Sequence, residues 1–293
     1  MSGEITLCRK EMQVVVFAGQ GDARRSMALL WRTDDEPPPR TGPGPRPALS
    51  VDAIVDAAIV VADAEGMTAL SMRAVGNRLG RTAMALYTYV PSKSELIDLM
   101  YDRVLAGLFV GPSPAASEVG WRSAVTGWVD DVLTCFVRHP WVLQVSQARP
   151  VLGPNEYLVL ETLLRILATT GLGAREVQAI VATLFHFVRG AAKTIAEARQ
   201  APTATGVTDE EWWQARSTLL PEFAPDFAER FPFVARFQAA SARVAQQSGS
   251  AARPQAGDEP YLEGEARTSV AVGLAVLLDG IEATMRRART GEG

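Results

Sequence analysis

A short stretch of the chain concentrates basic side chains and contains no acidic ones. It begins at Ser71 and carries Arg73, Arg78, Arg81 and Lys93. Guanidinium and ammonium groups donate charge-assisted hydrogen bonds to phosphate oxygens, and a guanidinium can also bind two acceptors on a guanine edge. These residue types are therefore suited to contact with a nucleic acid.

The basic stretch is a local feature of an acidic chain, whose formal net charge is −4. Within residues 47–93 all four acidic side chains precede Gly66 and all four basic ones follow it. Residues 94–293 carry 18 basic and 23 acidic side chains. This distribution argues against a general polyanion binder and confines positive charge to one short segment.

The remaining composition is that of a globular protein. A chain of 293 residues with 47% apolar side chains can bury one large core or two smaller ones. No uninterrupted run reaches the roughly 18 apolar residues of a membrane span, so a cytoplasmic protein without membrane contact is expected. Cys8 and Cys135 lie far apart with no CxxC spacing, so neither a disulfide, a metal site nor a cofactor is expected.

Three short helices are predicted around the basic stretch. Ser50 is a candidate N-cap for a first helix of about 15 residues that Gly66 ends. Ser71 can cap a second helix that ends at Gly80, and a third is predicted over residues 83–89. A short turn that contains glycine makes two helices cross steeply, which is the spacing of a helix-turn-helix.

The third helix is expected to turn unusual side chains outward. Leu86 must face inward with Leu79 if the short helices share a core. The side chains then left outside are Met84, Ala85, Tyr87 and Thr88. An outward methionine and tyrosine are unusual for a surface that meets only solvent.

Residues 1–46 are predicted to be a flexible extension. They include EPPPRTGPGPRP, whose proline and glycine density prevents regular backbone hydrogen bonding. Met27 is an alternative candidate for the first residue, because no periodic pattern precedes it. Arg40 and Arg46 could enter a minor groove as an arm, or the extension could have no function of its own.

Residues 96–293 are predicted to form a second helical domain, so the fold class is all-α with a helix-turn-helix domain at residues 47–95. Residues 239–261 are rich in Ala, Ser, Gln, Gly and Pro and are predicted to form a mobile surface loop. Helices are predicted at 94–110, 121–139, 141–147, 155–170, 174–199, 209–220 and 262–289.

The segment LSMRAVGNRLGRTAMALYTYVPSKSELIDLM resembles the DNA-binding domain of TetR-family transcriptional repressors, and the likeness extends from Leu49 to about Leu108. The motifs RHPW, ARPVLGPNE, FHFVRGA, EWW and LLDGIEA resemble the C-terminal domain of the tetracycline-repressor branch. The resemblance implies a homodimer on double-stranded DNA, with recognition helices about 34 Å apart that enter successive major grooves of a palindromic operator.

The resemblance also assigns DNA-binding roles position by position. Arg73 is the candidate for reading a guanine edge. Thr82, Ala83, Met84 and Ala85 match the start of the recognition helix, where small or apolar groups touch thymine methyls. The phosphate-contacting positions are Ser71, Tyr87, Ser92 and Lys93. Tyr87 could equally be a core residue with a wet hydroxyl, and Arg78 a solvated helix charge.

A mainly aromatic and aliphatic pocket is predicted in the second domain, for a small hydrophobic or aromatic ligand. Its candidate lining residues are Trp128, Phe136, Trp141, Tyr157, Leu160, Leu163 and Phe185, although each could be plain core. His186 and Arg189 lie one turn apart and could orient an anionic or carbonyl-bearing ligand. His139 most simply sits at a helix C-terminus, where its partial charge is favourable.

Two long apolar helices are expected to pair with those of a second subunit as a four-helix bundle, as the resemblance implies. Their apolar stripes could instead form core within one chain. Arg189 could also pair across such an interface. The predicted interface residues are Leu184, Val188, Ala191, Leu274, Leu277, Leu278 and Ile281.

A metal-chelated tetracycline is not expected as the ligand. The likeness to the tetracycline repressor places Val145 where that repressor has a metal-binding histidine, and Thr194 where it has an acidic residue. No metal site is therefore predicted.

The predicted function is a transcriptional repressor that binds its operator without ligand and is released when a hydrophobic molecule changes the spacing of the recognition helices. Residues 94–110 would transmit that change to the DNA-binding domain. An activator or a ligand-independent regulator would have the same fold. An enzyme is not expected, because the chain has no GxSxG, HExxH or phosphate-binding glycine loop.

Overall fold

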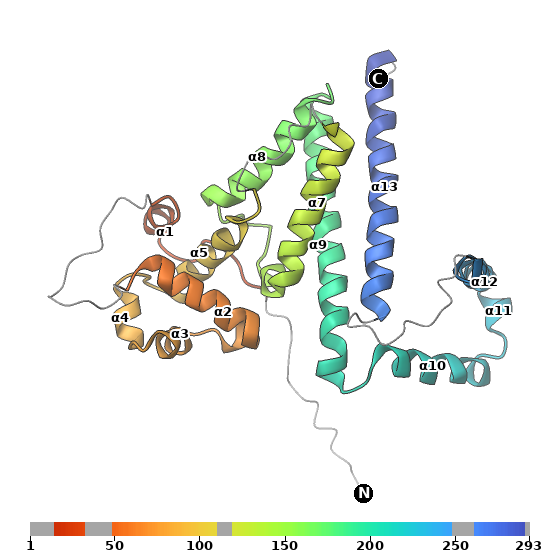
Figure 1. Cartoon of the computed structure of the whole chain (residues 1–293), viewed down its shortest axis with the longest axis horizontal. Coiled ribbons are helices and arrows are strands. Elements are labelled where there is room, and N and C mark those ends of the chain that lie inside the picture. The colour runs from red at the N-terminus through yellow and green to blue at the C-terminus, as the bar shows by residue number, and fades with distance from the viewer. Residues whose placement is uncertain (1–14, 33–48, 110–118, 248–260, 291–293) are drawn as a thin grey trace, which may run out of the picture. The chain divides into compact units, whose positions relative to one another are not determined.

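The computed structural model describes residues 15–32, 49–109, 119–247 and 261–290. Every regular element in these ranges is a helix, apart from one isolated β-bridge, so the predicted all-α fold is confirmed (Figure 1). The elements are α1 (Ala23–Leu30), α2 (Val51–Ala69), α3 (Met72–Leu79), α4 (Ala83–Tyr87), α5 (Lys93–Leu105), α7 (Trp121–Arg138), η1 (Pro140–Gln144), α8 (Pro154–Ala168), α9 (Ala174–Thr205), α10 (Asp209–Phe223), α11 (Phe227–Arg230), α12 (Pro232–Gln247) and α13 (Tyr261–Thr290).

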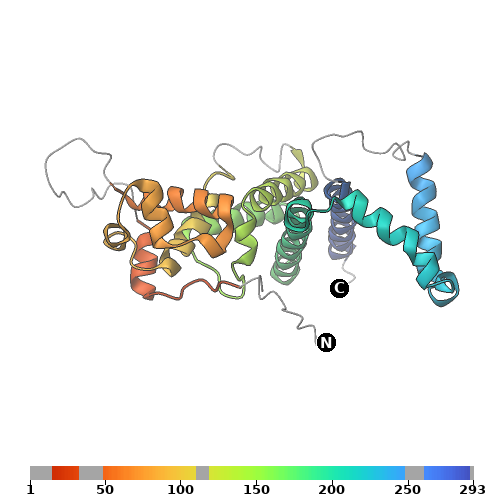
Figure 2. The ribbon, with the colours of Figure 1, turned by 90° about the horizontal axis from the view of Figure 1, so that it is seen from below.

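The chain divides into two compact units. The first contains residues 1–193 and 276–293, and the second contains residues 194–275. All the predicted DNA-binding and ligand-binding residues lie in the first unit. Within that unit, the N-terminal part of α9 and the C-terminal part of α13 run side by side in two perpendicular views (Figure 1, Figure 2).

Local capping sets the limits of α2, α3 and α4. The side-chain oxygen of Ser50 accepts a hydrogen bond from the amide of Ala53 at 3.1 Å. Ser71 does the same for α3, which Gly80 ends in the left-handed conformation with φ of 62°. Each cap satisfies a backbone amide that the first helical turn leaves without an intrahelical partner. The capping residues predicted from the sequence therefore cap these helices in the structure.

The α3–α4 turn is tight because Gly76 lets the backbone pass close by. A Cβ atom built on Gly76 would lie 2.7 Å from the carbonyl oxygen of Arg81, which real Cβ contacts do not tolerate. Beneath this turn, Ile54, Val75 and Leu86 are fully buried. The steep crossing of α3 and α4 therefore rests on one absent side chain and on a small shared core.

Several predicted helix limits are wrong by a few residues. Gly66 interrupts α2 with φ of 78°, as a stop signal should, yet the helix resumes and reaches Ala69. The helix predicted at residues 83–89 ends earlier, at Tyr87, and the one predicted at 94–110 ends at Leu105. Helix ends fray, and their last turn follows tertiary contacts more than local sequence.

The prediction of a flexible extension at residues 1–46 is wrong for residues 15–32. These residues contain the β-bridge and α1, whose N-cap Asp22 accepts a hydrogen bond from the amide of Arg25 at 2.9 Å. Ala18 and Leu30 are buried, so this part packs against the rest of the unit. Arg40 and Arg46, proposed for a minor-groove arm, lie outside the described residues.

The predicted surface loop at residues 239–261 is wrong over its first part, because α12 continues to Gln247. Residues 239–247 are rich in alanine and glutamine, which favour helix when no proline or glycine interrupts them. Residues 248–260 lie outside the described ranges. Neither α11 nor the start of α12 was predicted from the sequence.

Two helices meet the length and hydropathy of a membrane span, contrary to the expectation from uninterrupted apolar runs. They are α9 and the Glu263–Thr290 part of α13. Core helices of soluble proteins pass the same test, so the observation is weak evidence for a membrane. The finding concerns length and composition only.

A charged cluster joins α2 to the segment that follows α7. Trp141 is buried, and its indole nitrogen donates a hydrogen bond to Asp63 of α2 at 2.7 Å. His139 was predicted at a helix C-terminus, and it is the C-cap residue of α7. Its Nδ1 lies 2.9 Å from a carboxylate oxygen of the same Asp63. Asp63 therefore ties the first domain to η1.

We expect Asp63→Ala to lower the free energy of unfolding by about 1–3 kcal/mol, because a buried indole N–H would lose its acceptor. Asp63→Asn, which keeps an oxygen acceptor, should lose less. Glu65→Ala, at an exposed position of the same helix, is the matched control. Urea denaturation measures all three, and equal losses for Asp63→Ala and Glu65→Ala would contradict the role given to Asp63.

Truncation of two residues of α4 should change the stability by very different amounts. Leu86→Ala should cost about 2–5 kcal/mol of unfolding free energy, because the side chain is 0% exposed. Met84→Ala should change stability by no more than about 0.5 kcal/mol, because Met84 is 76% exposed. Thermal unfolding measures the stability of both variants. A strongly destabilised Met84→Ala variant would show that the Met84 side chain packs against other residues.

Candidate functional site

The outward face of α4 is as the sequence predicted. Met84 and Tyr87 are 76% and 42% exposed, whereas Leu86 between them is fully buried. Thr82 at the start of the helix is also exposed, and Ala83 and Ala85 are half-buried. The small side chains leave the backbone of α4 accessible, so this face can approach another surface closely.

Arg73 on α3 is exposed and uncommitted. No hydrogen bond or ion pair within the described part of the chain engages Arg73 or its neighbour on the same helix, Arg78. A guanidinium without an internal partner keeps its donors for an external acceptor. Arg73 and the face of α4 therefore form one candidate DNA-binding surface.

Three of the predicted DNA-contacting residues, Ser71, Thr82 and Ser92, are helix N-caps. The oxygens of Ser71, Thr82 and Ser92 accept hydrogen bonds from the amides at the start of α3, α4 and α5. In Ser71 and Thr82 the hydroxyl proton has no partner within the described residues, so it can donate to a phosphate. Ser92 donates its proton to Glu95, which leaves it less suited to that role.

Lys93 already has an internal partner. Its Nζ lies 3.5 Å from the carbonyl oxygen of Met67 in α2, and desolvation by burial lowers the pKa of the ammonium group. The side chain as a whole is nevertheless exposed. Lys93 can therefore contact a phosphate only from a position close to the end of α2.

The predicted pocket residues do not all meet. Trp128, Phe136, Trp141 and Leu163 are buried, and Leu160 and Phe185 are half-buried. The rings of Trp128 and Phe185 meet edge to face at 5.2 Å, and the Trp128 indole donates to the carbonyl of Val159 at 3.0 Å. This pair is the aromatic centre of the second domain.

Three other predicted pocket residues have contacts or exposure unlike those of this pair. The indole of Trp141 is committed to Asp63 of α2. Tyr157 is half exposed, and its ring lies 6.0 Å from that of Trp31, next to α1. His186 is exposed on α9. Helical periodicity could place these residues on apolar faces but could not show which neighbour each face meets.

Arg189 has the most unusual surroundings of the predicted ligand residues. One terminal nitrogen, Nη2, donates to the carbonyl oxygens of Leu143 and Val145, both at 2.9 Å. The other, Nη1, is buried and has no hydrogen-bond partner within the described residues. Burial lowers the pKa of Arg189, and the guanidinium carbon lies 5.9 Å from the centre of the Phe136 ring. A buried donor without a partner is costly unless a ligand or water completes it.

The predicted dimer residues are mostly core of one chain. Leu184, Val188, Leu274, Leu278 and Ile281 are buried without any second subunit, and Ala191 and Leu277 are half-buried. These five side chains have little exposed surface in the single chain, and their place at an interface stays a prediction. Exposed apolar side chains lie elsewhere on α13, where Val272 and Val276 are 62% and 64% exposed.

A groove that the sequence did not predict runs between α9 and α13 within the first unit. It has a volume of about 270 Å³. Its lining residues are Glu176, Ala179, Ile180, Thr183, Leu184, Leu277, Gly280, Ile281 and Thr284. Small side chains at three- and four-residue spacing, such as Ala179, Thr183 and Gly280, were the available signal.

No group of three or more His, Cys, Asp or Glu residues is placed to hold a metal ion within the described ranges. Val145, which matches the position of the metal-binding histidine in the tetracycline repressor, is buried. Its side chain offers no ligand atom for a metal.

Comparison with known proteins agrees with the fold. Residues 54–100 match the family described as bacterial regulatory proteins, tetR family, and residues 113–253 match the tetracyclin repressor-like C-terminal domain. Members of such a family are DNA-binding regulators and not enzymes.

Curated relatives include the HTH-type transcriptional repressor DrrR1 of Streptomyces coeruleorubidus, which is 38% identical over 221 residues, or 74% of this chain and 78% of that protein. An HTH-type transcriptional regulator of Saccharopolyspora erythraea is 30% identical over 183 residues, or 62% of this chain and 76% of that protein. A crystal structure of ActR from Streptomyces coelicolor in complex with actinorhodin has the same fold, with a TM-score of 0.58, 23% identity and coverage of 82% of this chain and 98% of that one. The chain belongs to the TetR family of bacterial regulatory proteins.

Proposed function

We propose that this protein is a transcriptional repressor that binds a palindromic operator as a dimer and is released by a hydrophobic small molecule. The observation that carries the proposal is the uncommitted surface of Arg73, Met84 and Tyr87 on a helix-turn-helix. The relative DrrR1 is named a transcriptional repressor, and ActR has been crystallised with actinorhodin. A DNA partner implies a cytoplasmic location.

In this proposal, Arg73 reads a guanine and α4 lies in the major groove. Met84, with the alanines beside it, contacts thymine methyls, because its apolar side chain is 76% exposed. Tyr87, Ser71 and Lys93 contact phosphates, and these contacts set the register of the protein on the duplex. Thr82 can add a contact through its free hydroxyl proton, whereas Ser92 contributes mainly as the cap of α5.

The proposed dimer uses apolar surface that one chain leaves uncovered. The groove between α9 and α13 is lined by small and aliphatic side chains, and Val276 beside it is exposed. Helices of a second subunit can fill such a groove across a two-fold axis, because a self-complementary patch then covers itself. Three of the predicted interface residues, Leu184, Leu277 and Ile281, line this groove, whereas Leu278 is buried and does not.

The proposed ligand is aromatic and carries an oxygen acceptor. Trp128 and Phe185 offer an aromatic centre, and the buried Nη1 of Arg189 offers an unused donor. A carboxylate or carbonyl oxygen at this nitrogen would relieve the cost of a buried unpaired donor. The exposed His186 contributes less than the sequence suggested.

An activator on the same fold would bind the same kind of DNA site. DNase footprinting of the purified protein on DNA that flanks its gene, at fixed near-physiological salt with competitor DNA, tests the common part of both functions. A protected palindrome supports a dimeric sequence-specific regulator. A promoter fusion in a strain with and without the gene then separates repression from activation, because a repressor lowers and an activator raises expression.

We expect Arg73→Ala to reduce discrimination between the operator and a scrambled site by about 1–3 kcal/mol, because a base contact is lost. Arg78→Ala is the matched control, since Arg78 lies on the same helix and is equally exposed. The control should weaken specific and non-specific binding together, if it changes either. Fluorescence anisotropy with both DNAs measures the ratio, and an unchanged ratio for Arg73→Ala would remove its role as a base reader.

We expect Arg189→Met to abolish a preference for acidic aromatic ligands while operator binding persists. Methionine keeps an unbranched apolar side chain at this position but removes every donor. The probes are anthraquinone-2-carboxylate and anthraquinone, whose binding is followed by quenching of tryptophan fluorescence. Wild type should prefer the carboxylate and Arg189→Met should not, whereas His186→Ala should behave as wild type. No preference in the wild type would contradict the proposed ligand class.

A further inference from the structure

Residues 15–32, which we call the N-terminal strap, bind both domains of the first unit. They precede residues 54–100, which match the tetR-family domain. The strap runs from the β-bridge through α1 to Arg32, and three groups of contacts hold it in place. One lies on the segment after η1, one on α5 and one at the start of α2.

The first contact is a parallel β-bridge to the ligand-binding domain. The amide of Val16 donates to the carbonyl of Gln144 at 2.9 Å, and the amide of Ser146 donates to the carbonyl of Val16 at 2.7 Å. Val145 lies between these two partners, and its carbonyl accepts from Arg189. The strap thus holds the segment that also binds the buried guanidinium.

The second contact joins the strap to α5. The amide of Gly19 donates to both carboxylate oxygens of Asp98, at 3.1 and 3.3 Å. Gly19 adopts φ of 66°, a conformation that glycine takes without strain. Asp98 is buried, which raises its pKa to about 6, while the Gly19 amide acts in the opposite direction. A Cβ atom on Gly21 would overlap the carboxylate of Glu95, so the backbone also packs directly on α5.

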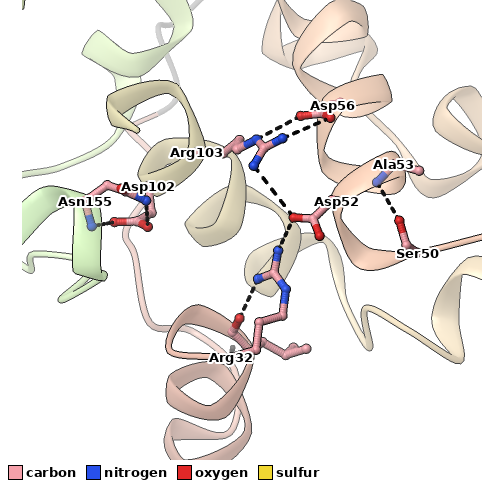
Figure 3. A network of polar contacts seen from close by, with 9 residues as sticks. Arg32, Ser50, Asp52, Ala53, Asp56, Asp102, Arg103 and Asn155 are labelled. Carbon is pink, nitrogen blue, oxygen red and sulfur yellow. Dashed lines mark hydrogen bonds and ion pairs between the residues drawn. The ribbon is translucent and has the colours of Figure 1, made fainter. Parts of the chain in front are cut away.

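The third contact lies at the end of α1. The indole of Trp31 donates to the carbonyl of Leu152 at 3.0 Å, which again belongs to the ligand-binding domain. The next residue, Arg32, binds Asp52 at the start of α2, and Arg103 of α5 approaches the same carboxylate at 3.9 Å (Figure 3). Adjacent residues of the strap therefore hold opposite domains.

We propose that the strap positions the helix-turn-helix relative to the ligand-binding domain and so keeps the protein in the arrangement that binds DNA. Asp98 lies within residues 54–100, the match to the tetR-family domain, so the N-terminal end of the strap contacts that domain as well as the segment at Val145. Each end of the strap then bridges the two domains, and a rotation of one domain must break contacts at both ends. If the arrangement that binds DNA is only partly populated, the apparent affinity falls by that fraction. The strap raises the fraction, and Asp98 and Arg32 are positioning residues that never touch DNA. This inference rests on the proposed function.

Two pairs of variants test it. Asp98→Leu removes the acceptor of the Gly19 amide, whereas Asp98→Asn keeps one oxygen acceptor. Arg32→Ala removes the ion pair with Asp52, whereas Arg32→Lys keeps a charge. Hydrogen exchange of the Val16 and Ser146 amides shows whether each variant releases the strap. The chain that begins at Met27, which lacks the first two contacts, is a further variant if a substitution prevents folding.

Orientation is measured without DNA, by the spin-label distance between Asn77→Cys on α3 and Glu161→Cys on α8. Both positions are exposed. The label is placed in a Cys8→Ser background, since Cys135 is buried, and labelled chains are diluted with unlabelled ones so that only distances within one chain are seen. Operator affinity is measured in parallel on the unlabelled proteins.

Releasing the strap should broaden the distance distribution and weaken operator binding about tenfold in the Asp98→Leu, Arg32→Ala double variant. The conservative variants should keep a narrow distribution and an affinity within about twofold of wild type. Faster exchange at Val16 and Ser146 with an unchanged distribution, or a broadened one with unchanged affinity, overturns the inference. A wild-type protein that binds no operator refutes the proposed function instead, while the distances still report whether the strap positions the domain.

Discussion

The arrangement of the first unit depends on buried carboxylates along one face of α5. Glu95, Asp98 and Asp102 follow one another at spacings of three and four residues, and all three are buried. A buried carboxylate is tolerable only where hydrogen-bond donors surround it. Asp98 accepts from the amide of Gly19. Asp102 accepts from the backbone and side-chain amides of Asn155 (Figure 3) and from the backbone amide of Glu156, at the start of α8. The positions of the strap and of α8 are therefore set by α5, whose first residues belong to the DNA-binding domain.

Ion pairs at the surface also join α5 to α2, and they are weak enough to allow more than one orientation of these two helices. Arg103 of α5 binds Asp56 at 3.0 Å and approaches Asp52 at 3.9 Å, and these side chains are about half exposed (Figure 3). Each such pair contributes no more than about 1 kcal/mol, because water competes for both charges. Two orientations of α2 and α5 can then differ by only a few kcal/mol. A ligand that prefers one of them by a similar amount can shift the population.

The helix-turn-helix could be predicted from the sequence because its signals are local. Ser71 and Gly80, the two caps of α3, lie next to the helix that they limit. The burial of Leu86 follows from helical spacing. The strap could not be predicted in this way. Gly19 and Asp98 lie 79 residues apart, and the partner of Val16 lies beyond residue 140. A structure that forms only when distant segments of the chain come into contact leaves no periodic pattern in the local sequence.

The dimer residues show a second limit of sequence reasoning. An apolar stripe indicates that a helix face is covered, but burial against the same chain and against a partner gives the same pattern. On α9 and α13 the clearest stripe, with Leu184, Val188 and Leu278, is covered by the chain itself, while Val276 remains exposed. A helix shared between a core and a partner must be apolar on both sides. That requirement explains why these same two helices reach the length and hydropathy of membrane spans, although polar residues interrupt every long apolar run.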